Sequence, residues 1–133
     1  MMILDLSEKQ IVDAINVGLK SLNNPSNKPG ILLVSGLKYK ANKQGDLLSL
    51  EFIDKANHTH KIDVKNPDPN KKYTVAADDF FATGGDGYLE SNKHPEFVLQ
   101  QFDVDKNKLA CDYIKKLNQP MEIKNDDRIQ IVD

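Results

Sequence analysis

The sequence predicts an α+β domain with a mixed, largely antiparallel sheet and two main helices. Helical periodicity occurs near the start of the chain, at residues 8–22, and again after Asp103. Between these segments, short runs of alternating apolar and polar residues are separated by turn-forming residues, a pattern typical of antiparallel strands. The order helix, several strands, helix, strand favours α+β over the strand–helix alternation of parallel sheets.

The length and composition limit the classes of protein to which the chain belongs. Its 133 residues fit one domain with a moderate core. Hydrophobic residues make up 39% and charged residues 29% of the chain, which predicts a soluble folded protein. The net charge of -2 argues against a nucleic-acid partner, which requires a basic face. No apolar run approaches the roughly 18 residues of a membrane span, and the N-terminus lacks the basic region of a signal peptide.

The first helix is predicted from a capping signal and an apolar stripe. Residues 3–6 are expected to form a short strand, after which Ser7 serves as N-cap and Gln10 completes a capping box. The apolar residues at helical spacing are Ile11, Val12, Ile15, Leu19 and Leu22. Gly18 weakens this helix slightly, and a loop rich in helix breakers follows at 23–30.

Strands are predicted through the middle of the chain. We expect one strand or two at 31–41, broken near Gly36, and further strands at 47–53, 58–64 and 73–77, with turns or loops at 42–46, 54–57 and 66–70. The residues from Tyr88 to about Asp103 are expected to be irregular. A helix capped by Asp103 or Asp105 then carries Leu109, Ala110, Tyr113, Ile114 and Leu117 and stops at Gln119-Pro120, before two short strands at 121–123 and 128–132.

The segment from Asp79 to Tyr88 is the candidate functional segment. It reads Asp-Phe-Phe-Ala-Thr-Gly-Gly-Asp-Gly-Tyr, with three glycines in four positions. Glycine allows positive φ and close approach to the backbone, and loops of this kind commonly carry binding groups. Asp86 supplies a hydrogen-bond acceptor beside the flat rings of Phe80, Phe81 and Tyr88, which suits a small molecule with a hydroxylated part and a flat part. By its spacing alone, however, the segment is better interpreted as a turn between two elements.

Histidine and serine give weaker signals for chemistry. His58 and His60 share one face of a strand, but the nearby sequence supplies no third ligand, so a solvent-facing pair is favoured over a metal site. His94 is expected to be exposed. Ser35 lacks the G-x-S-x-G setting of a strained nucleophile.

The remaining acidic residues and the cysteine are interpreted as structural. Asp78 or Asp79 is expected to cap the turn after a strand, and the two are not expected to act as the paired carboxylates of a glycosidase. Cys111 is the single cysteine, which excludes an internal disulfide, and it is interpreted as a small core residue. The residues themselves therefore indicate a binding domain without a catalytic centre.

Three longer motifs follow one another along the chain. They are Val-Ser-Gly-Leu-Lys-Tyr at 34–39, Asp-Pro-Asn-Lys-Lys-Tyr-Thr-Val-Ala at 68–76, and the segment 79–88. Together they resemble the C-terminal domain of the 5'-nucleotidase family, which includes ecto-5'-nucleotidases, UDP-sugar hydrolases and 2',3'-cyclic-nucleotide phosphodiesterases. Residues 6–15 resemble the family's first helix, and residues 109–117 and 127–129 resemble its last helix and strand. The resemblance covers nearly the whole chain and is far more specific than the glycine turn alone.

The resemblance implies roles for four residues of the segment 79–88. Phe80 would stack on a nucleobase, and Asp86 would accept hydrogen bonds from the ribose hydroxyls, with Gly84 and Gly85 shaping the turn that aims the carboxylate. Stacking of a base on an aromatic ring is worth roughly 1–3 kcal/mol, and an acceptor-only carboxylate suits a cis-diol with two donors.

The chain departs from the family pattern at two positions and lacks one element of it. The family often has Asn or Ser where this chain has Asp79, and it commonly has Gly where this chain has Asp127. Its second stacking aromatic, as well as the hinge of its domain rotation, belongs to a segment upstream of Met1. This chain therefore supplies one side of the implied base clamp.

The resemblance also implies that hydrolysis takes place on another domain. In the family, a pair of divalent metals bound by Asp, His and Asn on an N-terminal metallophosphatase domain clamps the attacking and leaving oxygens. The corresponding ligand motifs, such as Asp-x-His and Gly-Asn-His, do not occur in these 133 residues. We therefore expect no catalytic residue, metal or other cofactor in this chain.

These observations lead to one expectation and two alternatives. We expect residues 1–133 to be a single substrate-binding domain, slightly truncated at its N-terminal side, of a larger hydrolase, and to be inactive alone. Its partners would be a nucleotide or nucleoside and the metallophosphatase domain, and the family implies an extracellular or cell-surface location in a bacterium. The alternatives are a non-catalytic interaction domain that has lost nucleotide binding, and a free-standing metal hydrolase using His58 and His60.

Overall fold

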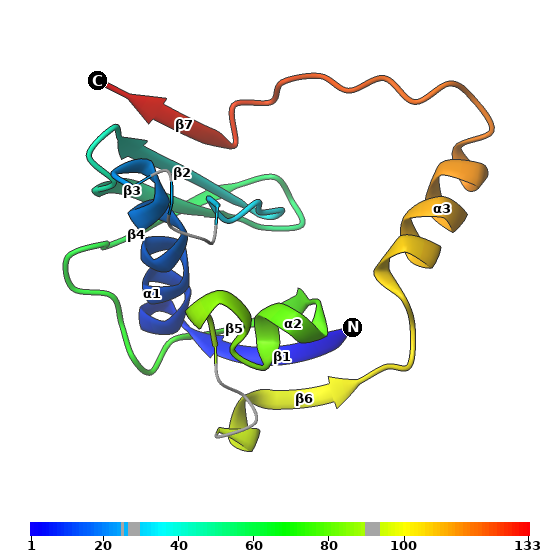
Figure 1. Ribbon diagram of the computed structural model, residues 1–133, viewed down its shortest axis with the longest axis horizontal. Helices are drawn as coiled ribbons and strands as arrows, with labels where there is room; N and C mark the ends of the chain where they lie inside the picture. The colour runs from blue at the N-terminus through cyan, green and yellow to red at the C-terminus, as the bar shows by residue number, and fades with distance from the viewer. Residues whose placement is uncertain (25, 27–29, 90–93) are drawn as a thin grey trace.

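The computed structural model describes residues 1–24, 26, 30–89 and 94–133, which form two sheets connected by a helix (Figure 1). Sheet A has the strand order β5-β1-β6, and sheet B has the order β4-β3-β2-β7. All strand pairs are antiparallel except β2 with β7, which is parallel. The α+β class and the largely antiparallel pairing are therefore confirmed, although the strands form two sheets and not one.

The strands and helices have the following bounds. Sheet A consists of β1 (Met2–Ser7), β5 (Lys72–Ala77) and β6 (Val98–Gln101), and sheet B consists of β2 (Leu37–Asn42), β3 (Leu47–Ile53), β4 (Thr59–Ile62) and β7 (Ile129–Val132). The helices are α1 (Glu8–Leu19), α2 (Asp79–Ala82) and α3 (Lys106–Leu117), with 3-10 turns η1 (Lys20–Leu22), η2 (Gly85–Gly87) and η3 (Pro95–Phe97).

The core forms where α1 runs from sheet A to sheet B (Figure 1). Its largest fully buried side chains are Leu4 and Leu6 of β1, Ile15 and Leu19 of α1, and Leu50 of β3. Because these residues come from both sheets and from the helix between them, the apolar stripe of α1 is the surface on which the two sheets assemble.

The predicted capping box at the start of α1 is confirmed. The Ser7 hydroxyl accepts a hydrogen bond from the Gln10 amide at 3.2 Å, and the Gln10 side chain accepts one from the Ser7 amide at 2.8 Å. The regular helix ends at Leu19, and its predicted last turn is the 3-10 turn η1. The predicted turn at 42–46 is also confirmed, with Gly45 at a φ of 87°.

Two predicted strands are wrong and one strand was not predicted. Residues 31–34 pair with no described strand, and side chains bond two of their carbonyls instead: the Tyr39 hydroxyl donates to Leu32 O and the Arg128 guanidinium to Val34 O. Residues 121–123 are exposed and unpaired with any described strand. Residues 98–101, expected to be irregular, form β6 because β1 offers them its second edge.

The other corrections concern the end of the chain. The N-cap of α3 is Asp105, as one of the two alternatives predicted, and the strand predicted at 128–132 is confirmed as β7. Cys111 is exposed, so its prediction as a core residue is wrong, because α3 lies away from both sheets (Figure 1). No helix in the part of the chain that the structure describes is long and apolar enough to cross a membrane.

Glu8 fastens the first turn of α1 to β5 and to the loop before it. Its buried carboxylate accepts hydrogen bonds from the Tyr73 hydroxyl at 2.9 Å and from the Asp68 amide at 3.2 Å, and it pairs with the Lys71 ammonium at 3.2 Å. Burial raises the pKa of Glu8, but these three partners together outweigh burial and hold the pKa below its ordinary value of 4.5. The negative charge also suits the N-terminus of a helix.

Glu8 is therefore expected to contribute to the acid sensitivity of the domain. Because its folded pKa is lowered, its stabilisation is fully present above the unfolded pKa and is lost as the pH falls through the folded pKa. Urea unfolding between pH 7 and pH 2.5 should show a smaller loss of unfolding free energy for Glu8→Gln than for the wild type. The exposed Glu122→Gln serves as control and should follow the wild type; a Glu8→Gln profile parallel to the wild type would contradict this role.

Candidate functional site

The segment 78–88 starts at the end of β5 with a capped single turn of helix. Asp78 is the N-cap of α2, and its carboxylate accepts a hydrogen bond from the Phe81 amide at 2.8 Å. The Lys106 ammonium at the start of α3 binds the same carboxylate at 2.9 Å. The Phe81 amide and the Lys106 charge together hold the pKa of Asp78 below its ordinary value. The capping role predicted for Asp78 is confirmed.

The two adjacent phenylalanines of α2 have different environments. Phe81 is half-buried and packs against Tyr88, with 4.8 Å between the ring centroids and an interplanar angle of 41°. Phe80 is 61% exposed. Since neighbouring residues on a helix point about 100° apart, one ring anchors the turn to the core and the other is presented to solvent.

Tyr88 anchors the far end of the segment. Its side chain is buried, and its hydroxyl donates a hydrogen bond to Gly30 O at 3.2 Å. This hydroxyl lies against α1 at Gly18, where a Cβ atom would be 2.9 Å from it and 2.9 Å from the Leu32 amide nitrogen. The glycine that weakens α1 therefore makes room for the segment to approach the helix.

The glycines of the segment are required by its geometry. Gly84 and Gly87 have φ values of 98° and 79°, in the left-handed region that favours glycine. A Cβ on Gly85 would lie 2.5 Å from Phe80 O and 2.6 Å from two atoms of the Phe80 ring. The backbone of Gly85 thus supports Phe80 directly, a contact open only to a residue without a side chain.

Asp86 is exposed and has a left-handed backbone, with φ 55° and ψ 21°. Aspartate tolerates this conformation better than most residues, but it is still uncommon. Burial, followed by the nearby charge of Asp86, raises the pKa of Tyr88. The turn therefore holds an exposed carboxylate and an exposed aromatic ring on one short loop.

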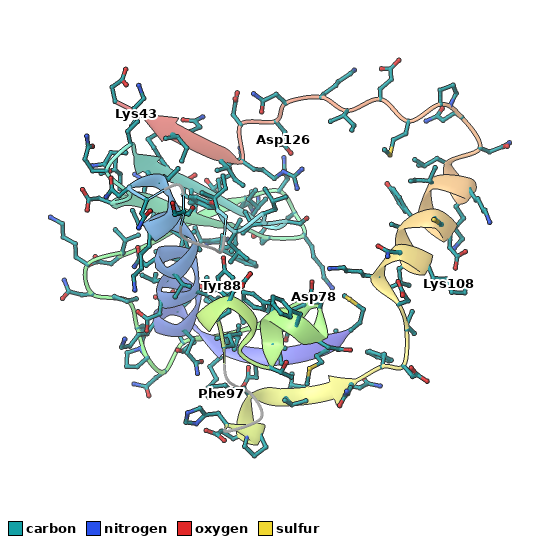
Figure 2. All side chains as sticks on the ribbon, in the orientation of Figure 1. Lys43, Asp78, Tyr88, Phe97, Lys108 and Asp126 are labelled. Carbon is teal, nitrogen blue, oxygen red and sulfur yellow. The ribbon has the colours of Figure 1, made fainter. Side chains whose placement is uncertain are left out.

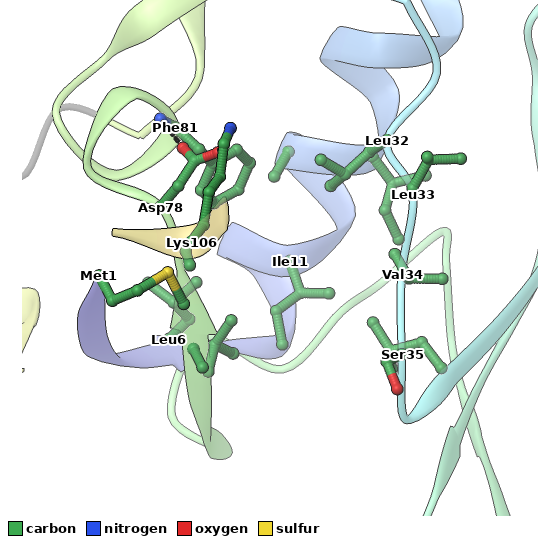
Figure 3. Close-up of a pocket in the computed structure, with 16 residues that line it drawn as sticks. Met1, Leu6, Ile11, Leu32, Leu33, Val34, Ser35, Asp78, Phe81 and Lys106 are labelled. Carbon is green, nitrogen blue, oxygen red and sulfur yellow. Dashed lines mark hydrogen bonds and ion pairs between the residues drawn. The ribbon is translucent and has the colours of Figure 1, made fainter. Parts of the chain in front are cut away.

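Two concave surfaces lie beside this segment. A recess of about 240 Å³ is lined by Met1, by residues 78–80 at the start of α2, and by residues 104–107 at the start of α3. A more apolar groove of about 350 Å³ extends along α1 and includes Asp78, Phe81 and Lys106 but neither Phe80 nor Asp86 (Figure 3). Of the two, only the smaller recess is lined by Phe80, and Asp86 lines neither of them.

The histidines lie elsewhere on the surface. His58 and His60 are exposed at the β3–β4 turn, where His60 Nε2 is 2.9 Å and His58 Nδ1 is 3.6 Å from Asp54 Oδ2. The His60 ring and the His58 amide hold the pKa of Asp54 below its ordinary value. His94 is exposed beside Glu96. Over residues 1–24, 26, 30–89 and 94–133, no three His, Cys, Asp or Glu side chains are arranged to hold a metal ion.

Sequence reasoning named most of the segment but missed its supports. The structure brings Phe80 and Gly85 into contact and places Gly84 and Asp86 in the same turn. The ion pair of Lys106 with Asp78 was not predicted, because the two residues are far apart in sequence and neither belongs to a local pattern. The contact of Tyr88 with Gly30 is long-range for the same reason.

Comparison with known proteins identifies the family. The model of the 5'-nucleotidase C-terminal domain matches residues 1–91. The chain belongs to this family. The match includes the whole segment from Asp78 to Tyr88, while the comparison with curated protein sequences found no match.

Two solved structures share the fold of this 5'-nucleotidase C-terminal domain. One is a 5'-nucleotidase precursor from Thermus thermophilus, which is 24% identical with a TM-score of 0.70 and aligns over 99% of this chain and 25% of its own. The other is the NAD nucleotidase of Haemophilus influenzae, at 18% identity and a TM-score of 0.73, over 98% of this chain and 23% of its own. The chain thus spans about a quarter of the length of either protein.

Gly85→Ala is expected to displace Phe80 and destabilise the domain. The new methyl group would clash with a backbone carbonyl as well as with the ring, and overpacking of this kind costs about 1–3 kcal/mol. Urea unfolding and the NMR shifts of the Phe80 ring measure the two effects.

Gly30→Ala is the matched control, because a Cβ at Gly30 has no neighbour within 4 Å among the residues that the structure describes, and its φ is outside the left-handed region. It should change the unfolding free energy by less than about 0.5 kcal/mol. Equal stability of the two variants, with unchanged Phe80 shifts, would show that Gly85 does not support the ring.

Proposed function

We propose that this domain binds the nucleoside part of a nucleotide and presents the phosphate to a metallophosphatase domain of the same protein. The observation that carries the proposal is the exposed Phe80 ring, held on the backbone of Gly85 and opening onto a recess. Binding of a flat ligand over an apolar ring that is fixed in this way is favourable, because the ring and the ligand remove apolar surface from water.

The proposed base site uses Phe80 as a stacking surface. The Asp78 cap fixes the turn of helix that carries the ring, and the Phe81–Tyr88 contact fixes that turn to the core. Since the supports are already in place without a ligand, little conformational entropy is lost when a base stacks. Stacking tolerates different bases, so this residue does not select among them.

The proposed ribose site uses Asp86, with Gly84 and Gly85 shaping its turn. A carboxylate is an acceptor only, and a ribose cis-diol offers two donors. Hydrogen bonds to a charged acceptor are stronger than neutral ones. The left-handed backbone of Asp86 supports this role, because strained conformations of this kind occur often at ligand-binding sites.

The family and the structural neighbours support the class of ligand. The matched family is that of 5'-nucleotidases, and one structural neighbour is a 5'-nucleotidase precursor while the other is an NAD nucleotidase. All three descriptions name enzymes that act on nucleotides. We extend this ligand class to the present chain and propose that the full-length protein is a phosphoric ester hydrolase.

The hydrolytic chemistry is assigned to the part of the protein outside residues 1–133. A pair of divalent metals on the N-terminal domain would activate the attacking water and stabilise the leaving oxygen. The residues described here would bind and orient the nucleoside. We also propose that the protein acts outside the cytoplasm, at the cell surface or in the extracellular space of a bacterium, which is the location that the family resemblance implies.

Titration of the 133-residue chain with adenosine tests the proposed site. We expect NMR shift changes at the amides of Phe80, Gly85 and Asp86, the residues of the proposed site. Phe80→Ala should abolish these changes. Shift changes confined to other surfaces, or a response that survives Phe80→Ala, would exclude the site and favour an interaction domain that has lost nucleotide binding.

In the full-length enzyme, Phe80→Ala is expected to raise KM with little change in kcat. Stacking acts on ground and transition states alike, and its loss of roughly 1–3 kcal/mol corresponds to about a 5- to 150-fold increase in KM. Steady-state kinetics with a nucleoside monophosphate measures the effect. Phe102→Ala, which truncates another exposed phenylalanine, should leave KM unchanged, and a fall in kcat at constant KM for Phe80→Ala would refute the role.

A further inference from the structure

The recess that Phe80 lines also contains several polar side chains. They belong to residues 78–79 at the start of α2 and to residues 105–107 at the start of α3. Stacking on an aromatic ring tolerates different bases, so a base on Phe80 would be selected by hydrogen bonds from neighbouring groups. The acceptors and donors in this recess are the groups nearest to the ring that can make them.

Most of the charged side chains in the recess are already paired within the protein. Asp78 caps α2 and binds the Lys106 ammonium at 2.9 Å (Figure 3), and Figure 2 shows Asp78 on the side of the body that faces α3. Asp105 caps α3, and its Oδ1 accepts a hydrogen bond from the Asn107 amide at 2.6 Å. These pairs connect the two walls of the recess and fix the start of each helix.

Asp79 keeps acceptor capacity for a ligand. Its side chain is 54% exposed, and its Oδ1 pairs with the amino group of Met1 at 2.9 Å. Among the residues that the structure describes, this amino group is the one donor that binds the Asp79 carboxylate. The two oxygens of a carboxylate have about four lone-pair sites, so Asp79 can still accept two parallel hydrogen bonds.

The proposed nucleoside position brings an edge of the base toward Asp79. Asp79 and Phe80 are consecutive and line the same recess, whereas Asp86 lies outside it and follows Gly85, which approaches one edge of the Phe80 ring. In a purine nucleoside, the ribose and the edge that carries N1 and C2 are at opposite ends of the base. With the ribose at Asp86 and the base on Phe80, the far edge of the base therefore meets the residues of the recess.

We propose that Asp79 accepts hydrogen bonds from this edge and gives the site a preference for guanine, an inference that rests on the proposed function. Guanine presents two adjacent donors there, the N1–H and the 2-amino group, and a carboxylate accepts both in a bidentate, charge-assisted pair. Adenine and hypoxanthine each present one donor group on the same edge. The side-chain amide of Asn107, which also lines the recess, can donate to the guanine O6.

Titration of the 133-residue chain with guanosine 5'-monophosphate and with inosine 5'-monophosphate tests this preference. The two nucleotides differ only in the 2-amino group, so stacking, ribose contacts and phosphate charge are the same for both. NMR shifts of the Phe80 and Asp86 amides give the two dissociation constants. We expect guanosine 5'-monophosphate to bind about fivefold more tightly or better, which is the discrimination that a bidentate pair to a base provides.

Asp79→Asn is expected to remove the preference, because an amide has one acceptor oxygen and cannot accept both donors in parallel. Asp103→Asn is the matched control. It removes the same charge from the segment before α3, but Asp103 is exposed and does not line the recess. The control should leave the ratio of the two dissociation constants unchanged, and the amide spectra of both variants show whether they fold.

The possible outcomes separate this inference from the proposed function. A preference for guanine that Asp103→Asn keeps and Asp79→Asn loses supports the inference. Equal binding of the two nucleotides at Phe80 and Asp86 overturns it but leaves the nucleoside site in place, and a preference that survives Asp79→Asn overturns the role of Asp79. If neither nucleotide shifts the amides of Phe80 or Asp86, the proposed site itself is wrong and the inference fails with it.

Discussion

The hydrogen bonds along the two edges of β1 determine where the functional parts of the domain lie. On one edge, all six residues of β1 pair with β5, from Met2 with Ala77 to Ser7 with Lys72. On the other edge, β1 pairs with β6. β5 leads directly into the Asp78 cap and the segment 79–88, and β6 leads into α3. The central strand β1 thus fixes where the candidate site and α3 begin. Helix α1 follows β1 directly and contributes to the core.

The candidate site combines local strain with firm support. Asp86 has a left-handed backbone, and the backbone of Gly85 lies against the Phe80 ring and carbonyl. Strained conformations persist only where their surroundings fix them. Here the Asp78 cap holds one end of the segment, and the buried Tyr88 side chain holds the other. The exposed ring and carboxylate therefore belong to a turn that is held to the body of the domain at both ends.

Local signals were predictable from the sequence, and features that depend on distant partners were not. The capping box at Ser7 involves residues three positions apart, so its pattern is complete in the sequence. Strand β6 forms because β1, about one hundred residues earlier, offers an edge. The segment 79–88 singles out Phe80 as a candidate residue, but the close approach of Gly85 to its ring is seen only from three-dimensional distances. Asp127, where the resemblance implies glycine in the family, has a φ of 55°, in the left-handed region that favours glycine.

Gly18, a residue of α1, helps to determine the position of the segment 79–88. With no side chain at position 18, the backbone of α1 meets the Tyr88 hydroxyl and the backbone of residues 30–32 directly. Any side chain there would act as a wedge between the helix and the segment that carries Phe80 and Asp86. Glycine lowers the helix propensity of α1 by about 1 kcal/mol relative to alanine. Because it has no side chain, the surface turn can lie directly against the backbone of α1. A residue that never faces a ligand is therefore one of those that define the shape of the surface a ligand would meet.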